Sequence, residues 1–237
     1  MSSLLLAGVG NAGVSYSQKL LGISPANLLA YWKLDETSGA TAYDSSGNGR
    51  NGTISGATLG AAGIGDGLTA MSFDGVNDFI NIYSASLSGA YMPNSMTILA
   101  WCKIPSAVWS DSAERQLLYF ESTWSGNRLG ILKQTDNKIY LFTQLGGVLN
   151  DTLIRPTSDT AWACVAVTFD STQKRTYYNG VQITSYNVGT HGANPLALAT
   201  IGAQSLSGAV PFKGDIAHVA IWNTPLSAAQ IATLAAV

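Results

Sequence analysis

The stretch AWACVAVTFDSTQKRTYYNGVQI, residues 161–183, constrains the fold of this chain more than any other. Its first half alternates between two sets of side chains over residues 162–169, and this period of two predicts a half-buried strand. A polar turn and a second predicted strand, residues 175–178, follow. Asn179-Gly180 is the type of residue pair that adopts positive φ in a two-residue hairpin turn, so residues 181–183 return as a third strand. Three antiparallel strands in so short a stretch predict an all-β domain.

The composition agrees with many short strands joined by tight turns. Only 11% of the 237 residues are charged, and 25 are glycine, a balance that suits strands and turns. A β-sandwich of this length is commonly a single domain. The formal net charge of −2, without any run of Lys or Arg, disfavours nucleic acid and anionic membrane surfaces as partners. No apolar run approaches the ~20 residues that cross a bilayer.

Several other segments occur in the same order as the motifs of a known family. They are residues 29–36 (LAYWKLDE), 44–52 (DSSGNGRNG), 73–80 (FDGVNDFI), 96–103 (MTILAWCK) and 212–227. Together with the hairpins of residues 161–183 they resemble the laminin-G-like jelly roll of the concanavalin A-like lectin/glucanase superfamily, over roughly residues 28–237. The resemblance implies a two-sheet antiparallel jelly-roll sandwich that ends in a short helix. It implies little about activity, because this fold hosts many unrelated functions.

Residues 1–27 lie outside the resemblance. They begin with an apolar run, but the run lacks a basic flank and is interrupted by glycines, so it predicts neither a secretory signal nor an anchor. Residues 15–21 predict a short helix before Pro25. We expect residues 1–27 to form an extended arm that docks on a neighbouring subunit, in a homo-oligomer or among virion proteins; the alternative is that the arm lies on its own domain.

The loop at residues 44–52 is similar to a calcium-holding loop of the family. The resemblance implies that Asp44 and Asn48, with Asn51 as a further candidate, supply oxygen ligands to a structural calcium ion. The sequence departs from the family at Ala217, where an acidic residue is usual, which removes one ligand. The alternative is that Asp44 and Asn48 cap turns through the backbone of their own loop.

Candidate ligand-binding residues lie between residues 109 and 127. Trp109, Trp124 and Asn127 combine aromatic rings with polar groups, the combination by which protein surfaces stack on sugars. Residues 117–120 in the same region predict an ordinary core strand. The alternative for most of these aromatic side chains is therefore the core.

Catalysis is not expected. The three glutamates, Glu36, Glu114 and Glu121, lack the ExDxE spacing by which laminarinase-like members of the superfamily align carboxylates for glycoside hydrolysis. The histidines His191 and His218 are isolated from each other and from any nucleophile or metal-ligand spacing, and we expect His218 to be half exposed on the final strand.

The two cysteines, Cys102 and Cys164, fall within predicted strands. We expect buried free thiols that behave as small apolar side chains. The alternative, a disulfide, requires neighbouring strands in register.

These observations predict a non-catalytic structural or interaction protein. A surface-type module with no recognisable secretion signal suits a protein released by lysis, so we expect a bacteriophage virion surface component, such as a capsid decoration protein or a tail or fibre part. The arm would anchor it and the jelly roll would be displayed on the virion or, after lysis, outside the cell. The alternative is a free lectin-like module, secreted or at the cell surface, that recognises cell-surface or polymeric glycan.

Overall fold

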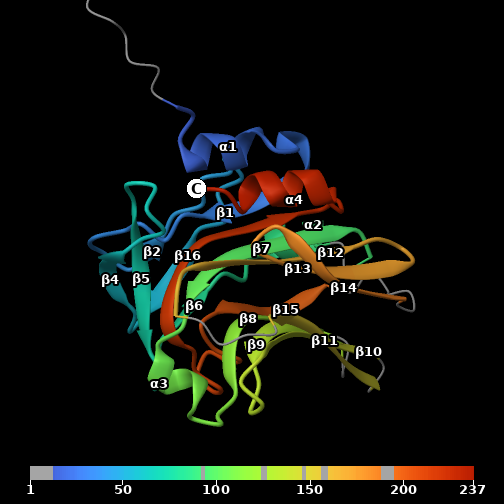
Figure 1. Cartoon of the computed structure of the whole chain (residues 1–237). Helices are drawn as coiled ribbons and strands as arrows, with labels where there is room; N and C mark the ends of the chain where they lie inside the picture. Colours follow the sequence, from blue (N-terminus) through green and yellow to red (C-terminus); the bar gives the residue numbers. More distant parts are fainter. Residues whose placement is uncertain (1–12, 92–93, 124–126, 146–147, 156–159, 188–194) are drawn as a thin grey trace, which may run out of the picture.

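Two antiparallel sheets of eight strands each lie face to face in the computed structural model, which describes residues 13–91, 94–123, 127–145, 148–155, 160–187 and 195–237 (Figure 1). Sheet A consists, in spatial order, of β14 (Val181–Asn187), β13 (Gln173–Tyr178), β12 (Ala163–Phe169), β7 (Met96–Lys103), β16 (Lys213–Trp222), β5 (Thr69–Asp74) and β4 (Thr58–Ala62), and β1 (Leu28–Trp32) also pairs with β16. Sheet B consists of β11 (Val148–Arg155), β10 (Ile139–Leu145), β9 (Arg128–Lys133), β8 (Arg115–Ser122), β15 (Leu196–Ile201), β6 (Phe79–Asn81), β3 (Gly52–Ser55) and β2 (Thr41–Ala42). The helical segments are α1 (Tyr16–Gly22), η1 (Pro25–Asn27), α2 (Ala85–Ala90), α3 (Ser106–Trp109) and α4 (Ala228–Leu234). The predicted all-β jelly-roll sandwich with its short C-terminal helix is confirmed.

Strand β12 shows the predicted alternation but is buried on both faces. Val165, Val167 and Phe169 pack between the two sheets, whereas Cys164 and Ala166 pack on the opposite face of sheet A. The prediction of a half-buried strand was wrong because helices α1 and α4 cover that second face. The period of two therefore predicted correctly that these residues form a strand and which side chains share a face. Whether the second face is buried depends on helices that are far away in the sequence.

The Asn179-Gly180 turn is the predicted tight hairpin. Both residues have positive φ, 46° at Asn179 and 82° at Gly180, as a two-residue turn between twisted strands requires. The Asn179 side chain also accepts a hydrogen bond from the backbone nitrogen of Cys164 at 2.9 Å. The hairpin is thereby tied to β12.

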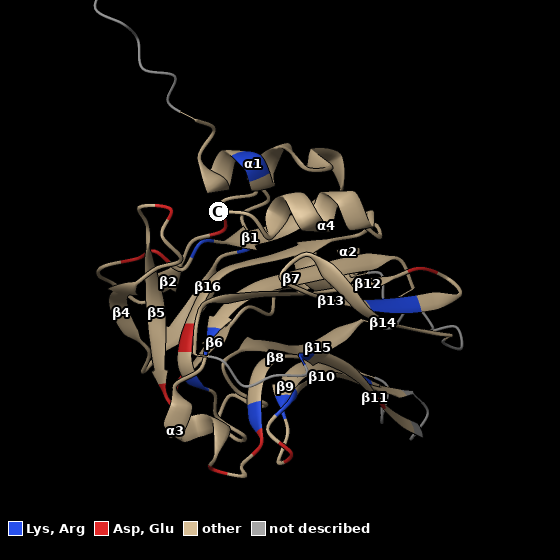
Figure 2. Ribbon diagram, in the orientation of Figure 1, with Lys and Arg blue, Asp and Glu red and all other residues tan. Residues whose placement is uncertain are grey.

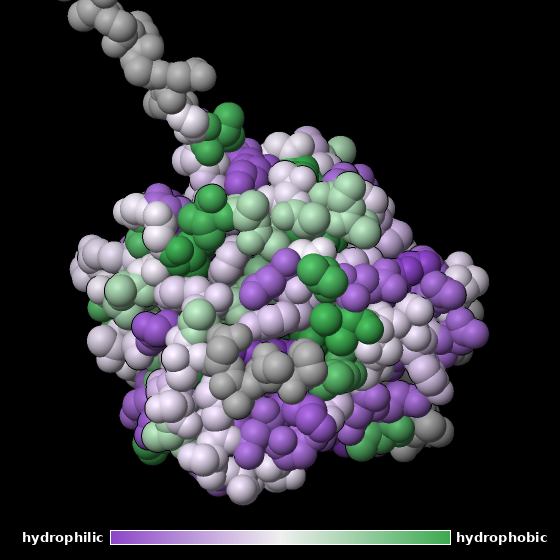
Figure 3. Space-filling model, in the orientation of Figure 1, coloured by the Kyte–Doolittle hydropathy of each residue, from purple (hydrophilic) through white to green (hydrophobic). Residues whose placement is uncertain are grey.

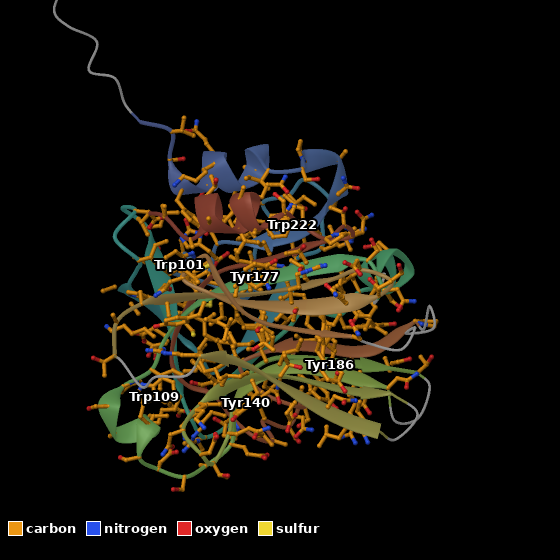
Figure 4. The ribbon with its side chains drawn as sticks, turned by 45° about the vertical axis from the view of Figure 1, so that its right-hand side comes forward. Trp101, Trp109, Tyr140, Tyr177, Tyr186 and Trp222 are labelled. Carbon is orange, nitrogen blue, oxygen red and sulfur yellow. The ribbon has the colours of Figure 1, made fainter. Side chains whose placement is uncertain are left out.

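Helix α1 packs against its own domain. Tyr16 and Leu20 are 3% and 0% exposed and join the apolar layer between sheet A and α4. The Tyr16 hydroxyl accepts a hydrogen bond from Trp101 Nε1 at 2.7 Å and donates one to Leu234 O at 2.9 Å. Figure 4 places Trp101, Tyr177 and Trp222 in this layer, beneath the two helices.

The prediction of an extended arm therefore does not hold for residues 13–27. This segment contains the short helix that the sequence predicted, with a capping box between Ser15 and Gln18, and the helix lies on sheet A. The rest of the predicted arm, residues 1–12, lies outside the described residues.

The two cysteines are buried thiols that are not joined in a disulfide, as predicted. In the register of β7 with β12, Cys102 lies opposite Ala163 and Cys164 lies opposite Trp101. Successive side chains of a strand point to opposite faces, so Cys102 faces sheet B while Cys164 faces the helices. The alternative of a disulfide between them is excluded by this geometry.

The surface carries few charges. Basic and acidic residues are scattered over the sandwich and interspersed where β8 and β9 approach the loop after α3 (Figure 2). The exposed side of α4 is pale green in Figure 3, as expected for an alanine-rich helix. Among the helices that the structure describes, none has the length and hydropathy needed to cross a membrane.

Candidate functional site

A hollow of about 290 Å³ opens on the face of sheet B that points away from sheet A. Strands β8 to β11 turn one set of apolar side chains inward, among them Leu118, Ile131 and Leu141. A separate apolar cluster of Tyr119, Leu132 and Phe142 lies on the outward set. The lining of the hollow consists of Glu114, Gln116, Arg128, Leu132, Gln134, Phe142, Gln144, Leu149, Asp151 and Gln204.

Strand register arranges the hollow as parallel rows of side chains. Tyr119 on β8, Gly130 on β9, Phe142 on β10 and Asp151 on β11 lie directly opposite one another. The next row contains Glu121, Arg128, Gln144 and Leu149 in the same strand order. Each row alternates with a row that faces the core, so the grid follows from the period of two along each strand.

Gly130 lies beneath the floor of the hollow, which Phe142 and Gln116 form. Tyr119 and Phe142 are two strand spacings apart, about 9.6 Å, yet their rings stack over Gly130 with centroids 6.1 Å apart and planes inclined by 24°. A Cβ atom at Gly130 would overlap the Phe142 ring and the Gln116 amide nitrogen. Glycine at this position is thus what permits an aromatic and amide surface at the bottom of the hollow.

The walls are polar and mostly uncharged. Gln116 is buried and donates to Ile131 O at 3.2 Å, and Gln134 Nε2 donates to Asp151 Oδ2 at 2.8 Å. The Tyr119 hydroxyl donates to Glu121 Oε2 at 3.2 Å. Burial raises the pKa of Tyr119, so the hydroxyl keeps its proton. Amides beside aromatic and aliphatic surfaces suit ligands that carry both hydroxyl groups and apolar C–H faces, such as sugars.

Trp109 does not present its ring to solvent. It ends helix α3, is 5% exposed and belongs to the core between the sheets. The guanidinium of Arg155 lies over its ring, 4.6 Å from the centroid. Trp109 is therefore a core residue, the alternative to a binding role, because the cation covers the ring face on which a sugar would stack.

The other two predicted binding residues are placed differently. Trp124 lies outside the described residues. Asn127 immediately precedes β9, is half-buried, and its carbonyl accepts a hydrogen bond from Ser122 N at 3.0 Å. Sequence reasoning missed the residues of the hollow, although the alternation of Tyr140, Phe142 and Gln144 with buried residues was a signal that could have indicated an outward aromatic and amide face. Figure 4 shows Tyr140 on this lower sheet.

The residues of the predicted calcium loop do come together. Asp44 Oδ1 accepts hydrogen bonds from Tyr31 N at 3.0 Å and Ser46 N at 2.9 Å, and its Oδ2 accepts one from Arg50 N at 2.9 Å. Asn51 Oδ1 accepts from Asp44 N at 2.9 Å. These contacts are those of the turn-capping alternative, since the oxygens that would bind a metal already accept backbone hydrogen bonds.

A guanidinium occupies the polar centre of this loop. Arg50 Nη1 donates to Leu29 O, and its Nη2 donates to Ser86 O at 3.2 Å. The Asn48 amide nitrogen donates to Leu28 O at 2.9 Å and to Leu29 O at 3.0 Å. Because N–H donors and a positive charge already satisfy these carbonyls, the donor set does not fit a calcium ion. No cluster of three or more His, Cys, Asp or Glu side chains suited to a metal occurs in the described part of the chain.

We expect the melting temperature of this protein to be the same in calcium and in EGTA, because Arg50 supplies the positive charge of the loop. Substituting Arg50→Ala should lower the free energy of unfolding by about 1–3 kcal/mol, since it removes the charged hydrogen bonds to Leu29 O and Ser86 O. The control Lys138→Ala removes an exposed ion pair and should cost below ~0.5 kcal/mol. A rise of several degrees on adding calcium would instead support the calcium hypothesis.

His218 is fully buried, and the prediction of a half-exposed histidine was wrong. It lies in an irregularity of β16 between Ala217 and Ala220, with φ 49°. Its Nδ1 is 2.8 Å from the Tyr31 hydroxyl and its Nε2 is 3.0 Å from Asp66 Oδ2. Helix α1 covers it, and the centroids of the Tyr16 ring and the His218 imidazole are 4.5 Å apart. Burial lowers the pKa of His218 to about 4, although nearby carboxylates oppose this shift.

The chain belongs to the concanavalin A-like lectin/glucanases superfamily, because the family model of that description matches residues 74–232. Among curated proteins, no sequence matches the chain significantly.

Three similar solved structures illustrate the fold. Domain 4 of AbnA, a GH43 extracellular arabinanase from Geobacillus stearothermophilus in complex with arabinotriose, has 21% identity and a TM-score of 0.64, with 88% of this chain and 98% of that chain covered. Trypanosoma rangeli sialidase in complex with sialic acid has 17% identity and a TM-score of 0.66, with 89% of this chain covered; this chain spans only 33% of the sialidase. The binding domain of Paraclostridial Mosquitocidal Protein 1 has 16% identity and a TM-score of 0.70, with 89% of this chain and 52% of that chain covered. Identities this low show the fold alone.

Proposed function

We propose that this protein is a non-catalytic carbohydrate-binding module that holds a glycan in the hollow on the outer face of sheet B. The observation that carries the proposal is the floor of Phe142 and Gln116 above Gly130, where the Phe142 ring is held in place by stacking on the buried Tyr119 ring. The hollow lies near the lower end of the range for small-ligand sites, which suits a short stretch of a glycan, of the order of one or two sugar rings.

The positions of the carboxylates support a binding role rather than catalysis. Glu121 on β8 and Asp151 on β11 are separated by three strand spacings, about 14 Å. Paired carboxylates of glycoside hydrolases lie ~5–9.5 Å apart. Glu121 also accepts a hydrogen bond from Tyr119, and Asp151 accepts one from Gln134. Glu121 and Asp151 are thus too widely spaced to act as an acid and base pair. Glu114, the other carboxylate that lines the described hollow, lies in the loop before β8 and is likewise three strands away from Asp151.

Similar structures give independent support. The AbnA domain, nearly all of which this chain matches, was solved with arabinotriose bound. The superfamily name itself includes lectins. A glycan is therefore the ligand class to test first, and arabinotriose is a reasonable first probe.

We expect the protein to retain at least one oligosaccharide from a panel that includes arabinotriose, measured on a glycan array and then by titration calorimetry. Substituting Leu149→Ala or Gln134→Ala should weaken binding about tenfold, because each removes a lining contact. Leu149 is 58% exposed and Gln134 is partly exposed, so folding should be retained.

Matched controls are available on the other sheet. Val181→Ala and Gln182→Ala alter an exposed aliphatic residue and an exposed glutamine on β14, and both should leave binding unchanged. An equal loss in the control variants, or a failure to retain any glycan, would contradict the proposed function.

The second candidate is the virion surface component predicted from the sequence. It is supported by the apolar segment of residues 1–12, which precedes the packed helix α1, and by the low charge of the chain, which suits a protein with large subunit contacts. The two roles are compatible, because an anchored protein can still present the outer face of sheet B to a host glycan. The solution mass of a chain that lacks residues 1–12 tests this role.

A further inference from the structure

We propose that the glycan held in this hollow is neutral, and that Glu114 and Asp151 exclude sugars that carry a carboxylate. The inference rests on the proposed function and adds the class of ligand. It follows from how the charges around the hollow are paired.

The positive charge in the hollow has a carboxylate opposite it on the neighbouring strand. Arg128 is the single cation among the described lining residues. It lies directly opposite Glu121 in the register of β8 with β9, and its side chain is close enough to the Tyr119 hydroxyl to oppose the rise in the pKa of that group. An acidic sugar would have to compete with Glu121 for this guanidinium. A typical carboxylate-binding arginine instead has both of its terminal N–H groups available for a bidentate pair.

Two other cations near β8 and β9 share one carboxylate, that of Asp111. Lys133 Nζ lies 2.9 Å from Asp111 Oδ1, and Arg115 Nη2 lies 2.8 Å from Asp111 Oδ2. The Lys133 side chain is also completely buried. Neither cation lines the hollow, so neither offsets its negative charge.

The negative charge of the hollow is only partly offset. Lys174 on β13 interacts electrostatically with Asp151, but its side chain is fully buried and does not line the hollow. Asp151 is exposed, and its side-chain partner Gln134 is neutral. Glu114 is exposed and lies in the loop before β8, on the opposite side of the hollow from β11. A ligand between them has a fixed carboxylate on each side. At an intermediate effective dielectric, a sugar carboxylate ~6 Å from one of these groups is disfavoured by the order of tenfold.

The remaining polar groups favour hydroxyls. Gln116, Gln134, Gln144 and Gln204 line the hollow. The Gln116 amide nitrogen already donates to Leu118 O and Ile131 O, so Gln116 offers its oxygen as an acceptor. One N–H of Gln134 donates to Asp151, whereas an amide in general can both donate and accept. Sugar hydroxyls have the same dual capacity, so such walls recognise a sugar without using charge. The lining thus combines neutral recognition with repulsion of anions.

The test is an array printed with matched neutral and acidic oligosaccharides, such as galactotriose with trigalacturonic acid and lactose with 3′-sialyllactose, alongside arabinotriose. We expect binding to be confined to neutral glycans, with their acidic counterparts at least tenfold weaker. The double variant Glu114→Gln with Asp151→Asn should narrow the ratio of neutral to acidic binding by about tenfold. The control Asp74→Asn removes an exposed carboxylate on β5 of the other sheet and should leave the ratio unchanged.

The outcomes separate this inference from the proposed function. Equal or preferred binding of acidic glycans, or a ratio that the double variant does not change, overturns the inference while glycan binding stands. Failure to bind any glycan overturns both.

Discussion

A chain that begins at residue 28 is expected to lose cooperative thermal unfolding, whereas one that begins at residue 13 should melt as the full chain does. The first deletion removes the buried Tyr16 and Leu20 and uncovers Trp101 on the outer face of sheet A. It also removes Ile23 O, which accepts a hydrogen bond from Trp222 Nε1 at 2.9 Å. Burial of two such side chains stabilises by about 3–6 kcal/mol, a large part of the ~5–15 kcal/mol of a whole domain.

Point variants refine this prediction. Leu20→Ala should cost about 2–5 kcal/mol, and Tyr16→Phe about 1–3 kcal/mol, because it leaves the Trp101 and Leu234 groups without their partner. The control Val14→Ala changes a side chain that is 69% exposed and should stay within ~0.5 kcal/mol. Chemical denaturation of each variant gives these values. An unchanged melting curve for the chain that begins at residue 28 would contradict the assignment of α1 to the core.

The same deletions test assembly without confusing it with folding. Light scattering on the full chain and on the chain that begins at residue 13 gives their masses in solution. If residues 1–12 anchor the protein to neighbours, the full chain should form a larger particle and the shortened, still folded chain should be a monomer. Equal masses would contradict the anchoring role.

Acidification from pH 7 to pH 4 is expected to destabilise the protein through His218. In the unfolded chain a histidine binds a proton below its ordinary pKa of about 6.5, whereas burial lowers the pKa of His218 in the folded state to about 4. Between these values the unfolded state binds more protons, so stability falls as the pH falls. The stability that depends on neutral His218 is fully present above pH ~6.5 and is lost as the pH falls towards ~4. This loss is of the order of 2–3 kcal/mol.

A variant that lacks His218 isolates this contribution. His218→Asn suits the site because Asn tolerates the left-handed φ of 49°, and its side-chain oxygen can accept from the Tyr31 hydroxyl. The variant should be less stable at pH 7 but should lose less stability on acidification. Urea unfolding at several pH values measures both slopes. Parallel pH profiles for the two proteins would exclude His218 as the cause.

Local sequence determined the strands, the turns and the helix ends. The alternation over residues 162–169 specified β12 and its two sides, because successive side chains of a strand must point to opposite faces. Asn179-Gly180 specified a hairpin because both residues accept positive φ. The Ser227 and Gln230 pair specified the start of α4 through a capping box. These signals depend only on neighbours in the chain, and the order of the segments then indicated the fold.

Tertiary structure alone decided burial and the candidate site. His218 and Cys164 are buried because α1 and α4 cover sheet A, and Trp109 is covered by Arg155, which is distant in sequence. The hollow depends on the register of four strands, which aligns Gly130 between Tyr119 and Phe142. Each strand's own pattern says which side chains share a face, but the position of one strand against the next is set by long-range packing and hydrogen bonding. Sequence thus determined the sandwich, and only its assembly determined which of its surfaces could receive a ligand.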